Sequence, residues 1–337
     1  MASLVGSRVE RKEDKKLLTG RGKYTADVTF AHQTYAYFVR SPHARAEIKK
    51  VDISKAEKAS GVVAVLTGKD IANDKIGGLI AGWRIKSEDG SDMKVPAHPP
   101  LASETVNYVG DHVAVVIAES LDEARNAADL VKVDYKVLNA VVDTADAMKS
   151  DQIYKDIPKN LCFDWLLGDR AKVKEAFDKA DKIIKIDLIN NRLIPNAMEP
   201  RAANADYNPS TEEITLYTTS QNPHLARIII SAFNGVAPEN KLRVIAPDVG
   251  GGFGSKIYPY AEEVVCSWAA KKTERPVKWV ADRTESFLSD CHGRDHVTHA
   301  ELAVKNDGTF LGFKNETIAN IGAYASVFAT VTPTYLF

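Results

Sequence analysis

The amino-acid sequence of 337 residues predicts a mixed α/β (α+β) fold with two domains, residues 1–150 and residues 151–337. Residues 109–119, which read VGDHVAVVIAE, are the strongest predicted strand of the chain, and residues 131–135 alternate as a second strand. The helix expected between them starts with the capping pair Ser120 and Glu123 and carries alanines on one face. Strand–helix–strand units in a chain long enough for roughly two cores predict the α/β class.

Two further strands, a short helix and a long loop complete the first predicted domain. Residues 30–39 are expected to form a strand, and residues 61–67 form a second strand that is buried because its apolar character is continuous. A short helix is expected at residues 54–59, where a serine and a glutamate have the spacing of a capping box. Residues 71–100 are rich in glycine, proline and charge, which predicts a long surface loop.

The second predicted domain continues with both helices and strands. Its helices are expected at residues 170–180, from Pro223 to Asn234-Gly235, and at residues 261–272. The helix after Pro223 is expected to bury Ala226, Ile229, Ile230 and Phe233. Its strands are predicted at residues 183–190, 213–218, 242–245, 277–280, 296–304 and 310–318, the last two as an antiparallel pair. The apolar end of the chain, residues 331–337, has no capping element, and this is unusual for a finished domain.

Composition excludes several classes of function. The formal net charge of −1 lacks the basic surplus of a nucleic-acid-binding protein. The first residues have no apolar core of signal-peptide length, and no apolar run approaches the roughly 20 residues that span a bilayer. Three dispersed cysteines indicate reduced thiols and a cytoplasmic location, and the lack of a C-x-x-C motif predicts no iron–sulfur cluster in this chain.

The strongest candidate for a ligand site is the glycine-rich stretch RVIAPDVGGGFGSKI at residues 243–257. It does not fit a P-loop, because Ile257 stands where the hydroxyl residue should follow Lys256. A dinucleotide fingerprint fails as well, because Ser255 occupies its third glycine position. A tight turn between strand and helix remains the alternative. Four glycines within five residues exceed what a turn needs, so the spacing favours a ligand that approaches bare backbone.

Other polar groups are weaker candidates. Gln221 precedes the predicted helix at Pro223, where it caps the helix or donates its amide to a cofactor; by itself, the capping interpretation is favoured. The group Cys291, His292, His296 and His299 lacks the close spacing of a zinc site. Two further pairs, one in Met198-Glu199-Pro200-Arg201 and one in Asp282-Arg283-x-Glu285, are expected to be structural ion pairs. No arrangement of a nucleophile with a base is convincing.

Several stretches together resemble one family. The molybdenum-cofactor segment in large subunits of molybdenum hydroxylases is similar to two stretches of this chain, TTSQNPHLAR at residues 218–227 and VIAPDVGGGFGSK at residues 244–256. The similarity is to the carbon monoxide dehydrogenase and aldehyde dehydrogenase branch of that family. Three stretches resemble the small α/β hammerhead domain of that family: VERKEDKKLLTGRGKYTADV, VRSPHARAEI and NYVGDHVAVVIAES. Two more, NRLIPNAMEPRAANADY and PVKWVADRTESF, resemble intermediate signature stretches. The resemblance covers nearly the whole chain.

The resemblance implies a hammerhead domain followed by the first part of a molybdenum-cofactor-binding domain. Gln221, Gly251, Gly252, Phe253 and Gly254 match residues that approach the cofactor. The expected cofactor is the molybdopterin cytosine dinucleotide, whose dithiolene holds the metal, so no metal ligand is expected in this chain. Ile257 replaces the glutamate of purine-hydroxylating members, which disfavours a purine and favours carbon monoxide or an aldehyde as the substrate.

The resemblance also implies partners. Large subunits of this family are more than twice as long, so the remaining half of the large subunit, with its general-base glutamate, is expected outside this chain. An FAD-binding medium subunit and a 2Fe-2S small subunit are expected to take the electrons released when the small-molecule substrate is oxidised with water-derived oxygen. The sequence therefore predicts part of a molybdenum-dependent oxidoreductase that is inactive without the missing half. The alternative is a non-catalytic scaffold that contributes assembly contacts only.

Overall fold

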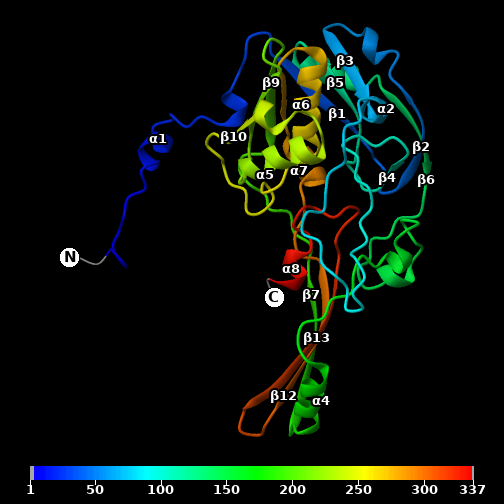
Figure 1. Ribbon diagram of the computed structural model, residues 1–337, viewed down its shortest axis with the longest axis vertical. Helices are drawn as coiled ribbons and strands as arrows, with labels where there is room; N and C mark the ends of the chain where they lie inside the picture. Colours follow the sequence, from blue (N-terminus) through cyan, green and yellow to red (C-terminus); the bar gives the residue numbers. More distant parts are fainter. Residues whose placement is uncertain (1–3, 336–337) are drawn as a thin grey trace.

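The computed structural model describes residues 4–335 and divides into a body and a narrow extension (Figure 1). A seven-stranded mixed sheet forms the body. Its strands follow in the order β10 (Leu242–Ile245), β9 (Glu213–Thr218), β8 (Ala202–Asn208), β11 (Val277–Val280), β1 (Thr34–Arg40), β5 (His112–Ala118) and β3 (Val62–Thr67). The pairs β10–β9 and β1–β11 are parallel, and the other neighbours are antiparallel.

This sheet joins strands from both sides of residue 150. β1, β5 and β3 come from the first 150 residues, and the other four strands come from later in the chain. Helix α3 (Leu121–Ala128) packs on β1 and β5, whereas the three-stranded antiparallel sheet β4 (Thr105–Val106), β2 (Ala46–Asp52) and β6 (Lys132–Val137) lies beside them. The division into residues 1–150 and 151–337 stays a prediction.

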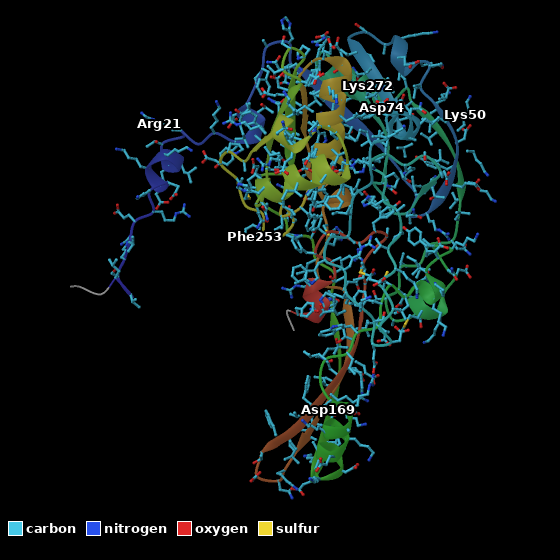
Figure 2. All side chains as sticks on the ribbon, in the orientation of Figure 1. Arg21, Lys50, Asp74, Asp169, Phe253 and Lys272 are labelled. Atoms are coloured by element: carbon cyan, nitrogen blue, oxygen red, sulfur yellow. The ribbon has the colours of Figure 1, made fainter. Side chains whose placement is uncertain are left out.

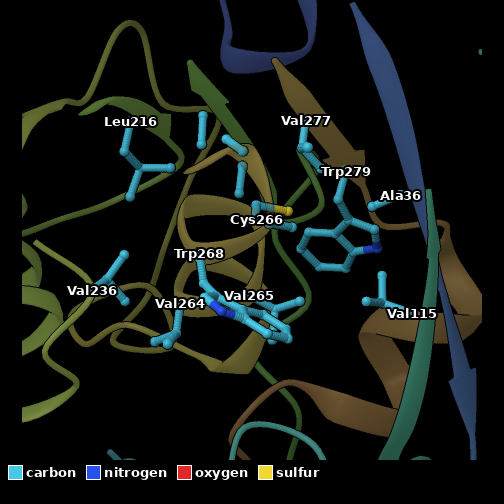
Figure 3. Close-up of a cluster of buried hydrophobic side chains, with 14 of the residues drawn as sticks. Ala36, Val115, Leu216, Val236, Val264, Val265, Cys266, Trp268, Val277 and Trp279 are labelled. Carbon is cyan, nitrogen blue, oxygen red and sulfur yellow. The ribbon is translucent and has the colours of Figure 1, made fainter. Parts of the chain in front are cut away.

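A core of apolar side chains fills the space between the sheet and helix α6 (Ala261–Thr273). Val264, Val265 and Trp268 of α6 are buried there beside Trp279 of β11 (Figure 3). Phe38 of β1 meets the Trp279 ring edge-on, with 5.9 Å between the ring centroids. Burial of such large rings dominates the stability of a core.

The extension consists of β7 (Lys182–Asn190), β12 (His296–Val304) and β13 (Phe310–Ala319), paired in the order β13-β12-β7, with helix α4 (Arg170–Asp178) against β13. It projects away from the body in Figure 1. Helix α1 (Asp14–Leu18) lies apart from the body near the N-terminus (Figure 1). The remaining helices are α2 (Gly68–Asn73), α5 (Pro223–Ile228), α7 (Arg283–Ser289) and α8 (Val331–Thr334).

Most of the predicted elements are present. Ser120 caps α3 as expected, because its hydroxyl accepts the backbone N–H of Glu123 at 3.2 Å. The predicted strands at residues 183–190, 213–218, 242–245 and 277–280 correspond to β7, β9, β10 and β11, and β12 pairs with β13. The predicted apolar end reaches α8, while residues 336 and 337 lie outside the described part of the chain.

Several local predictions were wrong. β2 and β8 were not expected, because alanine, asparagine, aspartate and lysine are poor strand formers in isolation. Residues 54–59 form only a single 3-10 turn, since the Ser54 hydroxyl donates to Asp52 instead of capping a helix. The helix after Pro223 widens into a π-turn at residues 229–233, and this turn leaves Phe233 exposed.

Candidate functional site

The glycine-rich loop lies between β10 and α6, at the edge of the body where Figure 2 labels Phe253. Gly251 and Gly254 have φ angles of +96° and +93°, in a region that L side chains rarely adopt. Phe253 itself has a φ of +50° and is 75% exposed. A bulky residue with positive φ is strained, so the surrounding contacts must hold it in this conformation.

Gln221 holds the far end of the loop. Its side-chain Oε1 accepts the backbone N–H of Gly254 at 3.0 Å and that of Lys256 at 3.3 Å. Its own backbone N–H donates to the carbonyl of Lys256 at 2.7 Å. The capping interpretation of Gln221 was wrong, because Asn222 caps α5 by accepting the backbone N–H of Leu225 at 3.1 Å.

Two of the glycines are required by close approach. A Cβ at Gly252 would lie 2.3 Å from Oε1 of Gln221, and a Cβ at Gly250 would lie 2.5 Å from Cβ of Glu199. Both distances are far below a van der Waals contact, so any larger residue would force the neighbour to move. The repeated glycines therefore let two side chains press directly on the backbone of the loop.

Glu199 and Lys256 hold the near end of the loop, and the sequence pattern did not single out this pair. The carboxylate of Glu199 accepts the backbone N–H of Gly250 at 2.7 Å and contacts Nζ of Lys256 at 3.3 Å. Nζ of Lys256 also donates to the carbonyl of Glu199 at 2.7 Å. Burial of the ammonium lowers the pKa of Lys256, and the neighbouring Glu199 partly offsets this effect.

The contacts of Glu199 correct one expected ion pair. Arg201 pairs with Glu262 and Asp290 at 2.8 Å and 2.5 Å rather than with Glu199. Its guanidinium also lies 3.7 Å above the ring of Tyr260, whose hydroxyl donates to the carbonyl of Ser255 at 2.6 Å. A buried charge network therefore supports the loop from beneath. Local sequence patterns do not predict this network, because its residues are distant from one another in the sequence.

Three consecutive backbone N–H groups of the loop remain available. Gly251, Gly252 and Phe253 donate to no acceptor within residues 4–335, whereas the N–H groups of Gly250 and Gly254 are already engaged. Adjacent N–H groups in a stretch with positive φ angles form a concave donor site for anionic or oxygen-rich ligands. The loop can therefore receive a ligand that presents acceptor oxygens.

The second predicted ion pair is placed differently from expectation. Asp282 caps α7 by accepting the backbone N–H of Glu285 at 2.7 Å, and Glu285 pairs with Arg40 at 2.9 Å. The predicted ion pair is therefore confirmed for Glu285. Asp282 instead starts helix α7, which was not predicted.

The cysteine and histidines near residue 295 are not brought together as a set. His299 contacts Asp187 and Glu301 on the extension, whereas the N–H of Cys291 donates to the hydroxyl of Tyr260 in the body. Within residues 4–335 no group of three or more His, Cys, Asp or Glu residues could hold a metal ion. No helix in that part of the chain is long and apolar enough to cross a membrane.

A cavity lies away from the glycine-rich loop. It encloses about 690 Å³ between residues 140–165 and residues 317–334, with Tyr154, Cys162 and Asn320 in its wall. None of the residues 250–256 lines it. This cavity is therefore separate from the glycine-rich loop.

Comparisons with known proteins match both parts of the chain. Residues 153–337 match the model of the molybdopterin cofactor-binding domain, and residues 19–139 match the a/b hammerhead domain of aldehyde oxidase and xanthine dehydrogenase. These matches confirm the predicted fold class, a hammerhead followed by cofactor-binding structure.

Individual relatives agree with these matches. The nicotine 6-hydroxylase large subunit of Paenarthrobacter nicotinovorans is 34% identical over 96% of this chain and 39% of its own length. The carbon monoxide dehydrogenase large chain of Afipia carboxidovorans is 34% identical over 95% of this chain and 40% of its own length. The structure of a Cu,Mo-CO dehydrogenase superimposes with a TM-score of 0.84 at 32% identity, over 93% of this chain and 40% of that chain. The chain thus spans about two fifths of the length of these relatives.

Proposed function

The chain belongs to the molybdenum hydroxylase family of large subunits, and from this premise we propose that its glycine-rich loop forms one wall of the molybdenum-cofactor site. The relatives are molybdenum oxidoreductases, and the larger of the two matched domains binds molybdopterin. The proposed binding residues are Gln221, Gly251, Gly252, Phe253 and Gly254.

The observation that carries this proposal is the row of available N–H groups at Gly251, Gly252 and Phe253. Molybdopterin presents phosphate oxygens, and the metal carries oxygen ligands, so three adjacent donors fit the chemistry of the group. When it is bound, the cofactor supplies two-electron oxidation of the substrate with oxygen from water. Gly252 leaves no room for a Cβ beside Gln221, which is consistent with a loop built for close approach.

Each residue has its own task in this proposal. The Oε1 of Gln221 fixes the loop, and its Nε2, which has no acceptor among residues 4–335, is left to face the ligand. Gly254 contributes its positive φ, because its N–H already donates to Gln221. The exposed ring of Phe253 is held over the approach to the loop, where it excludes water and orients the bound group. We place no general base in this chain.

The finer features belong to the same proposal. The cofactor is the molybdopterin cytosine dinucleotide, and the substrate is carbon monoxide or an aldehyde. Electrons leave to a 2Fe-2S small subunit and an FAD-binding medium subunit, and the remaining half of the large subunit completes the site. Three cysteines without disulfide bonds, Cys162, Cys266 and Cys291, support a cytoplasmic location.

Metal and nucleotide analysis of the assembled complex tests the proposal. We expect about one molybdenum and one cytosine nucleotide for each copy of this chain, and turnover with carbon monoxide or an aldehyde. Nicotine is included in the panel because one relative is a nicotine 6-hydroxylase. A complex that contains all partner chains but no molybdenum would show that this chain is a scaffold only.

A matched pair of variants tests the loop itself. Phe253→Ala and Leu167→Ala each remove an exposed apolar side chain, so neither should change the fold. We expect Phe253→Ala to lower molybdenum content or turnover at least tenfold and Leu167→Ala to change neither. Equal behaviour of the two variants would refute the role of Phe253.

A further inference from the structure

The two faces of the extension sheet differ sharply in chemistry. Successive side chains of a strand point to opposite faces, so the ladder of β7, β12 and β13 sorts its residues into two sets. One face carries cross-strand ion pairs, which include Lys185 with Glu301 and Asp187 with His299. Helix α4 covers the end of this same face, where a Cβ at Gly312 would lie 2.9 Å from Cβ of Ala176.

The opposite face is largely apolar, and α4, the helix that packs on β13, lies on the face with the ion pairs. We call the opposite face the apolar face. Its apolar members are Ile184, Ile186, Leu188, Ala300, Leu302 and Phe313, and the same register adds the uncharged polar residues Thr298, Asn315 and Thr317. Ile184 is level with Leu302 and Phe313 across the three strands, and Ile186 is level with Ala300. The large side chains of its outer strands, Ile184, Ile186, Leu188 and Phe313, are 47–59% exposed. A contiguous exposed apolar patch of this kind marks an interaction surface.

The strand that contributes most to the apolar face is also a sheet edge. β7 has nine residues, all exposed, and in the part of the chain that the structure describes it pairs only with β12. A long edge strand with exposed apolar residues offers both unpaired backbone groups and a surface for side chains. A polypeptide that adds a strand to the edge and covers the face satisfies both.

We propose that the apolar face and the outer edge of β7 bind the remaining half of the large subunit. The face with the ion pairs is partly covered by α4, and its exposed apolar residues Ile183 and Ile189 lie near opposite ends of β7. The continuous apolar surface that needs an occupant is therefore the apolar face. The relatives carry about three fifths of their length outside the region matched here, which is enough polypeptide to cover the apolar face. The identity of this occupant rests on the proposed function.

Hydrogen–deuterium exchange on the complex, purified through a tag on this chain, tests the binding surface. The copurifying polypeptide is identified by whether its sequence matches the part of the relatives that this chain lacks. We expect that polypeptide in the complex, and we expect exchange in β7 and β12 to be at least tenfold slower than in the isolated chain.

Two matched variants on one strand separate the faces. Ile186→Asp places a charge on the apolar face, whereas Ile189→Asp places it on the opposite face at a position that is 75% exposed. We expect Ile186→Asp to reduce the recovered partner at least tenfold and Ile189→Asp to reduce it less than twofold, with unchanged circular dichroism for both isolated chains. Leu188→Asp repeats the test at a second position of the apolar face.

Each contrary outcome overturns the proposal. In the exchange experiment, these outcomes are fast hydrogen exchange of β7 in a complex that contains the partner, a complex of two copies of this chain alone, and recovery of this chain without a partner. In the variant experiment, the contrary outcome is that Ile186→Asp and Ile189→Asp recover equal amounts of the partner. Failure of the proposed function gives a different result, because the partner would then bind the apolar face in a complex that contains no molybdenum.

Discussion

Substitution of Gly252 by alanine probes the contact that shapes the glycine-rich loop. The new Cβ would lie 2.3 Å from Oε1, 2.5 Å from Cδ and 2.7 Å from Cγ of Gln221. Gln221 is exposed and flexible, so it can move aside, but it then loses the N–H groups of Gly254 and Lys256. At about 1 kcal/mol for each hydrogen bond, Gly252→Ala should cost about 2 kcal/mol of the free energy of unfolding.

Gln221→Ala should cost the same amount, because it removes the same two hydrogen bonds. In a chain that already carries Gln221→Ala, the clash at residue 252 no longer exists. The φ angle of Gly252 lies outside the positive region, so alanine is then tolerated and reduces the entropy of the unfolded chain. The double variant should therefore cost about 2 kcal/mol and not the additive 4 kcal/mol.

Urea unfolding followed by circular dichroism measures these differences. For 337 residues, about 2 kcal/mol corresponds to a shift of roughly 3 °C in Tm, so thermal melts give a second estimate. Gly90→Ala is the control, because Gly90 has a φ of +82° and no neighbour within 4 Å of its Cβ position. Its cost should add to that of Gln221→Ala. Additive costs for Gly252→Ala and Gln221→Ala would refute the view that Gln221 holds the loop.

Two further predictions concern buried polar groups. Arg201→Met should cost about 3–5 kcal/mol in urea unfolding, because it leaves the buried carboxylate of Glu262 without its bidentate partner. Arg275→Met, which removes a more exposed ion pair, should cost less than about 1 kcal/mol, and equal costs would contradict the importance of burial. Burial lowers the pKa of His98 to about 3 in the folded chain. Its imidazole therefore binds a proton at a higher pH in the unfolded chain than in the folded chain. As the pH falls below about 6.5, His98 thus lowers the free energy of unfolding. His98→Phe keeps a ring against Tyr324. Relative to the unmodified chain, this variant should gain about 1.4 kcal/mol of unfolding free energy per pH unit between pH 6 and pH 4. A constant difference between the two chains in urea unfolding across that range would contradict a neutral His98 in the folded chain.

Local patterns in the sequence were sufficient to predict the helices and strands whose own residues bury one face or cap one end. β5 is apolar along its whole length, and Ser120 with Glu123 starts α3, so both could be predicted from neighbouring residues. The same is true of the unusual glycine content of the loop, because positive φ angles are a local backbone property.

The contacts that turn the loop into a candidate site were decided by the tertiary structure. β8 lies in the middle of the sheet although its alanines and asparagine carry little strand preference, because pairing with β9 and β11 outweighs local propensity. Glu199 reaches Lys256 across 57 residues, and Arg201 reaches Glu262 across 61, so neither pairing has a sequence spacing that predicts it. The sequence alone determined that bare backbone is presented at residues 250–254. The folded chain decided which N–H groups stay available there, because Gln221 and Glu199 take the others only once distant segments meet.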